Sequence, residues 1–155
     1  MTVWGKYRFV QGSVSFSAGG FIVLPTGSED DGLGTGNMVP GAFGGVRVTA
    51  GPGFFVGDLT LRFNQDADIL DTHVDAKTST AFAGGYMWLP WHDWAFSGEL
   101  SVESERFSNS DSDFRVTAGA QFVGIKHSRL RGALGVGLTD GAPTYELILG
   151  YAYAF

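Results

Sequence analysis

The sequence predicts an all-β fold, an up-and-down antiparallel β-barrel of about eight to ten strands. Apolar and polar residues alternate with period two over most of the 155 residues, whereas apolar positions with helical spacing are hard to find. Residues typical of reversals separate these runs at short intervals, so most neighbouring strands can only be antiparallel. The length fits one β-barrel domain that covers residues 1–155.

The composition narrows the class of protein. Charged residues make up 17% of the chain and hydrophobic residues 44%, a balance that excludes intrinsic disorder. The net charge of -6 argues against nucleic acid as a partner, because that affinity depends on clustered lysine and arginine. Without cysteine there is no disulfide, no thiolate nucleophile and no cysteine-bound zinc.

Five strands are expected from two-faced runs in the first part of the chain. Gly12 separates the first two runs, and Gly51-Pro52-Gly53 fits a tight reversal between the third and the fourth. Longer connections are expected at residues 25–40 and 65–73. The runs cover residues 3–9, 13–24, 41–50, 54–64 and 74–88.

Four more strands complete a count of about nine. Pro90-Trp91-His92-Asp93 fits the reversal before the first of them, in which Leu100 lies on one face and Glu99 on the other. In the last run, tyrosine and leucine alternate with mostly small residues from Tyr145 onward. The runs cover residues 94–106, 113–125, 129–139 and 144–155.

The chemistry of the two faces favours a membrane over water. One set of alternating positions carries bulky apolar residues, and the other set carries small residues with interspersed charges of both signs. A membrane barrel turns its apolar face outward to lipid, whereas a soluble ligand-binding β-barrel, the alternative, buries that face inside. We therefore expect membrane lipid or detergent as the partner. The lumen-facing charged network is expected to consist of Lys6, Arg8, Arg47, Asp58, Arg62, Asp75, Lys77, Glu99, Glu103, Glu105, Arg115, Arg131 and Glu146.

The connections alternate between short and long, as in bacterial outer-membrane barrels with short periplasmic turns and long external loops. Aromatic residues gather near the short turns, where a girdle at the membrane interface is expected. The chain also ends on alternating aromatic residues, a feature of Gram-negative outer-membrane proteins. The predicted girdle consists of Trp88, Trp91, Trp94, Tyr153 and Phe155.

Several short motifs, weak alone but ordered along most of the chain, resemble one known family. They are Lys6-Tyr7-Arg8-Phe9, Leu24-Pro25-Thr26-Gly27 with Gly32-Leu33-Gly34-Thr35-Gly36, Ala83-Gly84-Gly85-Tyr86, Gly98-Glu99-Leu100, and the segment from Gly137-Leu138-Thr139-Asp140-Gly141-Ala142-Pro143 to Phe155.

The family is that of the outer-membrane barrels associated with the meta-pathway of phenol degradation. The resemblance implies a porin-like protein that passes small compounds, aromatic ones included. Members of the family are longer and carry further strands before the first motif, so the resemblance implies a natural short form, a truncation or an engineered variant.

No enzymatic activity is expected. Glu99, Glu103 and Glu105 share one face and could act as acid and base, but neutralisation by nearby basic residues accounts for them better. His127-Ser128 invites comparison with lipid-modifying barrel enzymes, yet it falls in a predicted short turn.

No metal or cofactor is expected, because His73 and His92 lie at the ends of separate strands. Asp66, Asp68 and Asp71, like Glu29, Asp30 and Asp31, do not follow the spacing of a calcium loop. The expected function is a narrow or plugged pore, and a structural barrel without a transport role is the alternative.

Overall fold

The computed structural model describes residues 1–26, 37–69, 72–108 and 110–153. Nine strands form one sheet, and two short strands form a separate hairpin, β5 (Ala67–Ile69) and β6 (Thr72–Val74). No helix in the described residues is long and apolar enough to cross a membrane. The nine strands are β1 (Thr2–Arg8), β2 (Val14–Val23), β3 (Val39–Ala50), β4 (Gly53–Phe63), β7 (Thr78–Trp91), β8 (Trp94–Glu103), β9 (Asp113–Phe122), β10 (Ser128–Gly137) and β11 (Tyr145–Tyr153).

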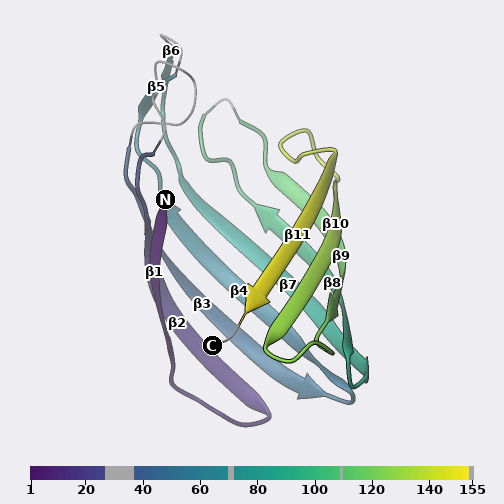
Figure 1. Ribbon diagram of the computed structural model, residues 1–155. Coiled ribbons are helices and arrows are strands. Elements are labelled where there is room, and N and C mark those ends of the chain that lie inside the picture. The colour runs from purple at the N-terminus through teal and green to yellow at the C-terminus, as the bar shows by residue number, and fades with distance from the viewer. Residues whose placement is uncertain (27–36, 70–71, 109, 154–155) are drawn as a thin grey trace.

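The sheet is an antiparallel meander. Its strands follow the order β1-β2-β3-β4-β7-β8-β9-β10-β11, and each is antiparallel to its neighbours (Figure 1). The all-β, up-and-down antiparallel prediction and the count of about nine strands are therefore confirmed at this level.

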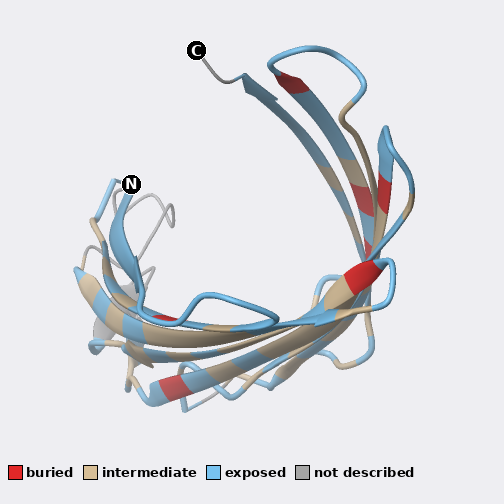
Figure 2. Cartoon of the chain, turned by 90° about the horizontal axis from the view of Figure 1, so that it is seen from below, coloured by how far each residue is buried: buried red, intermediate tan, exposed pale blue. Residues whose placement is uncertain are grey.

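Closure into a barrel is not observed. The sheet is strongly curved but open, with β1 at one edge and β11 at the other (Figure 2). Within the described residues these two strands do not pair. Both edge strands run from the side of the long connections to the side of the short turns. Direct pairing of β1 with β11 would therefore be parallel, unlike every other pair in the sheet.

The hairpin β5–β6 was not expected from the sequence. It lies in the connection between β4 and β7, which was predicted to lack strands, and each of its strands is only 3 residues long. Such short strands carry too little alternation to be recognised. β7 also begins at Thr78 and not at residue 74, because Val74 is the last residue of β6. Between the two strands, Ala76 forms an isolated bridge with Phe107 in the connection after β8.

Burial identifies the inner face of the curled sheet. Residues paired across antiparallel strands point to the same side, so the register assigns every strand residue to one of two faces. One face holds the small buried residues Ser17, Ser79, Ala95 and Ala133, whereas Ser128, the first residue of β10, is buried on the other. The other holds large apolar residues such as Leu149, which is 76% exposed. Side chains crowd on the inside of a curve, so we call the first face concave and the second convex.

Candidate functional site: the charged concave face

Every charged residue within the nine strands lies on the concave face. Ten residues of the predicted network lie there, namely Lys6, Arg8, Arg47, Asp58, Arg62, Glu99, Glu103, Arg115, Arg131 and Glu146. The register adds Asp113 and Arg129, which the sequence analysis missed although they have the same parity as Arg115 and Arg131. The other three predicted residues, Asp75, Lys77 and Glu105, lie outside the nine strands, in the connections next to β7 and β8.

One ion-pair cluster centres on Glu103, at the end of β8 nearest the long connections. Arg62 on β4 donates to Glu103 across β7, and Arg106 donates two hydrogen bonds to the same carboxylate, at 2.8 and 2.7 Å. These hydrogen bonds raise the pKa of the Arg106 guanidinium. Ser79, fully buried on the strand between, also donates to Glu103, at 3.2 Å. The Glu103 carboxylate therefore joins three strands and the connection after β8.

A second cluster centres on Arg115 on β9. Its guanidinium donates to Asp113 on the same strand at 2.5 Å and to Glu146 on β11 at 2.6 Å. Both interactions are partly buried. Glu146 reaches Arg115 across β10, where Gly135 leaves room above the sheet.

Cations without acidic partners gather toward the short turns. Arg8, Arg47, Arg129 and Arg131 lie on the halves of their strands nearest those turns, and within the described part of the chain none of them forms an ion pair. The paired carboxylates Glu103, Asp113 and Glu146 lie at the opposite ends of their strands. The concave face is thus basic near the short turns and neutralised near the long connections.

Aromatic rings accompany these cations on β3 and β4. The Arg47 guanidinium lies 3.7 Å from the centroid of the Phe54 ring, and the Lys6 ammonium lies 6.0 Å from that of Phe43. The register places both rings on the concave face. Phe54 and Phe55, although adjacent on β4, lie on opposite faces of the sheet, so only Phe54 shares the concave face with Arg47.

Within the described residues, two hollows open on the concave face. The smaller, ≈ 100 Å³, lies over β1–β4 and is lined by Lys6, Arg8, Arg47 and Asp58 among others. The larger, ≈ 200 Å³, lies over β7–β10. Its polar lining comes from Ser97, Glu99, Gln121 and Arg131. Hollows with charges of both signs suit small polar or charged solutes.

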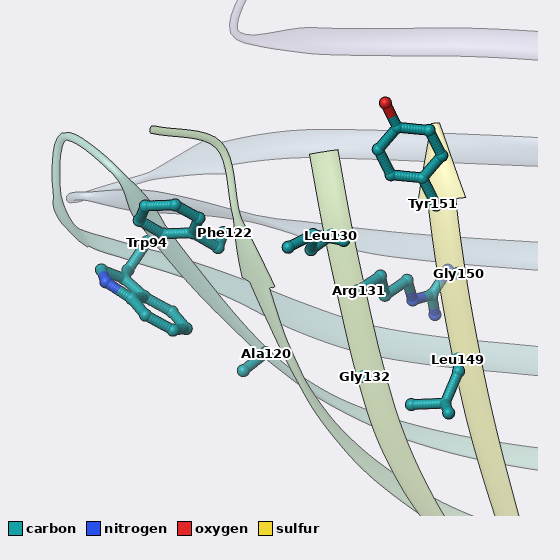
Figure 3. Close-up of a pocket in the computed structure, with 9 residues that line it drawn as sticks. All are labelled: Trp94, Ala120, Phe122, Leu130, Arg131, Gly132, Leu149, Gly150 and Tyr151. Carbon is teal, nitrogen blue, oxygen red and sulfur yellow. The ribbon is translucent and has the colours of Figure 1, made fainter. Parts of the chain in front are cut away.

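The convex face carries apolar grooves where glycine and alanine replace large residues. The groove shown in Figure 3 has a volume of ≈ 740 Å³ and runs over β8–β11. Ala120 and Gly132 form its floor, and Trp94, Phe122 and Leu149 lie around it. In the register, Ala120, Gly132 and Leu149 form one row across β9, β10 and β11. Arg131 also lines this groove, although the register assigns it to the concave face.

The predicted girdle residues gather only in part. Trp88, Trp91 and Trp94 surround Phe96, with ring centroids 6.0, 6.1 and 6.1 Å from it, at the turn between β7 and β8. Tyr153 lies at the short-turn end of β11, near His127. Phe155 lies outside the described residues, as do the motif residues 32–36 and Glu29, Asp30, Asp31 and Asp71.

The two candidate catalytic groups have structural partners. Glu103 is held by two arginines, and Glu105 forms an exposed ion pair with Lys77 at 2.5 Å. The Ser128 hydroxyl lies 3.0 Å from the hydroxyl of Tyr151. Glu103, Glu105 and Ser128 therefore each have a side-chain partner in the structure.

Comparison with family models and with curated proteins finds no match for this chain. The resemblance to the phenol-pathway barrels therefore stays a prediction.

Proposed function

We propose that the chain forms the wall of a bacterial outer-membrane β-barrel through which small compounds, aromatic ones included, can pass. The main support for the proposal is that the polar and apolar faces are reversed relative to a soluble β-protein, with charges inside the curve and large apolar side chains outside. All charges of the sheet lie on its concave face, and the convex face exposes large apolar side chains such as Leu134, Leu147 and Leu149. A soluble sheet would bury that apolar face, whereas lipid solvates it.

The dimensions of the strands support a membrane position. β8, β9 and β10 each contain 10 residues, and a tilted strand of about 9–11 residues spans the hydrocarbon core of a bilayer. The tryptophan cluster at the short-turn end suits the membrane–water interface. The groove over β8–β11 would then accommodate acyl chains.

The chemistry of the concave face suits the passage of small anionic solutes, aromatic ones included. Its unpaired arginines near the short turns attract negative charge, and Phe43 and Phe54 offer ring faces beside Lys6 and Arg47. A narrow lumen is expected, because barrels of about eight strands have interiors that side chains nearly fill.

A structural barrel without transport is the second candidate. It is favoured by the Arg62–Glu103 and Arg115–Glu146 pairs, which join strands across the concave face and stiffen the wall. Measurements of conductance in planar bilayers distinguish a transport barrel from a structural barrel.

Closure of the barrel with antiparallel pairs throughout requires an addition to the nine strands. Because β1 and β11 run in the same direction, one further strand between them would be antiparallel to both and would give an even number. Two copies inserted in the same direction would meet only at parallel seams. We therefore propose a single additional strand as the closing element.

Refolding into vesicles tests the membrane proposal. The purified chain is expected to acquire β-structure and resistance to protease with detergent or lipid vesicles, and to aggregate in plain buffer. A monomer that folds in buffer without detergent would contradict a lipid-facing convex face.

Planar bilayers test transport. Little steady conductance is expected from this chain, with an anion preference in whatever current is measured. Arg131→Ala should raise the current or alter its selectivity, because Arg131 lines the larger concave hollow. Lys126→Ala, in the turn between β9 and β10, removes the same charge outside the strands and is the matched control. Unchanged currents in Arg131→Ala would favour the structural barrel.

A further inference from the structure

Three side chains with metal-binding chemistry meet in the long connection between β4 and β7. Asp66, His73 and Asp75 each offer one ligand atom, and these atoms lie within 4.8 Å of one another. His73 lies on β6, while the two aspartates lie just outside the hairpin. The imidazole Nε2 of His73 is 3.6 Å from Oδ1 of Asp75. The hairpin therefore brings together residues that the sequence shows only as scattered.

Main-chain hydrogen bonds hold the two aspartates in place. Oδ1 of Asp66 accepts the Ala76 N–H at 2.7 Å, which fixes this carboxylate beside the short connection between β6 and β7. The Asp66 carbonyl accepts from the Asn37 side chain at 2.7 Å, and the Asp75 carbonyl accepts the Ser108 N–H at 3.0 Å. The cluster thus lies where the connections before β3, before β7 and after β8 meet.

The donor set determines which metal fits. One imidazole nitrogen and two carboxylate oxygens are ligands that zinc and neighbouring divalent transition metals accept, whereas calcium and magnesium prefer oxygen alone. Bonds of about 2.0–2.2 Å require the ligand atoms to approach one another to about 3–4 Å. The His73 and Asp75 side chains are 62% and 74% exposed, so they can make that small adjustment and leave room for water as a further ligand.

We propose that Asp66, His73 and Asp75 form a binding site for one divalent transition-metal ion of the zinc class. The bound ion fastens the β5–β6 hairpin to the neighbouring long connections, through the hydrogen bonds of Asp66 and Asp75. This site lies outside the nine-stranded sheet, so its existence does not depend on the membrane proposal.

Titration calorimetry with Zn²⁺ on the untagged full chain tests the site. The wild-type chain is expected to bind about one Zn²⁺. His73→Ala should weaken that binding by at least about tenfold, because loss of even an outer-shell partner of a ligand typically costs about 10–100-fold. Asp75→Asn should weaken it similarly. Asp75 is the better aspartate to change, because the Asp66 carboxylate also accepts a main-chain hydrogen bond.

His92→Ala is the matched control. His92 and Asp93 form an exposed pair at 2.9 Å in the turn between β7 and β8, with the same chemistry but no third ligand within the described residues. This variant should bind Zn²⁺ as the wild type does. Equal affinity in wild type and His73→Ala, absence of binding, or loss of binding only in His92→Ala would each overturn the proposal. Cobalt absorption in the visible range gives a second readout, because its intensity reports the coordination geometry of the ion, which should change in His73→Ala.

Discussion

Arg115 on β9 and Glu146 on β11 form an ion pair across the strand between them, with 2.6 Å between Nη1 and Oε2. Gly135 on β10 makes this possible. A Cβ atom built at Gly135 would lie 3.5 Å from Cδ of Arg115 and 3.3 Å from the hydroxyl of Thr117. The missing side chain on β10 therefore provides the space in which two non-adjacent strands meet.

Substitution of this glycine should break the pair. Gly135→Leu is expected to destabilise the chain by about 1–3 kcal/mol, because the larger side chain overpacks the site and separates Arg115 from its partner. Gly98→Leu is the control, since a Cβ at Gly98 meets nothing within 4 Å and lies on the convex face. Urea unfolding in detergent measures both. Equal midpoints for the two variants would show that the space above Gly135 does not matter.

The two carboxylates near the end of β8 should differ in importance. Glu103→Gln is expected to cost about 1–3 kcal/mol, because it weakens charged hydrogen bonds to Arg62 and Arg106 at a side chain that is only 13% exposed. Glu105→Gln should cost less than about 1 kcal/mol, since its pair with Lys77 is exposed. The comparison uses the same chemical change in both variants. A neutral Glu103→Gln would indicate that water solvates this part of the concave face.

Much of the sheet was predictable because alternation is a local signal. The run expected over residues 94–106 is observed as β8 (Trp94–Glu103), and that expected over 113–125 is observed as β9 (Asp113–Phe122). The same parity that assigned Arg115 and Arg131 to the charged face would also have assigned Asp113 and Arg129.

Features that depend on distant parts of the chain could not be predicted in this way. The pairing of Arg115 with Glu146 depends on the register of three strands and on the gap above Gly135. The grouping of Asp66, His73 and Asp75 depends on a hairpin whose strands are too short to show alternation. Local sequence patterns likewise do not show whether the two edge strands, β1 and β11, pair with each other.

Arginine on the convex face should be costly if that face contacts lipid. At Leu100, Leu134, Leu147 or Leu149 it is expected to cost about 2–4 kcal/mol near the bilayer midplane and less toward the rims. At an exposed surface in water the same changes would cost less than about 0.5 kcal/mol. Leu138→Arg, in the connection after β10, is the control and should be tolerated. Refolding into vesicles measures each variant, and tolerance of arginine at all four strand positions would exclude a lipid-facing surface.

Cross-linking can determine whether the two edge strands meet. The chain lacks cysteine, so pairs of cysteines can be introduced without background. Neighbouring strands lie about 4.8 Å apart, within the reach of a disulfide, whereas an intervening strand separates its neighbours by about 10 Å, which is too far. We therefore expect no disulfide between a cysteine at Leu149 on β11 and one at Val3, Gly5 or Tyr7 on β1.

The partners Leu134 and Leu147 on β10 and β11 provide the positive control, because they face each other in the register. A disulfide within one chain at any of the three test pairs would indicate direct parallel closure, and one between two chains would indicate that a second copy occupies the edge. Either result would contradict closure by a single additional antiparallel strand.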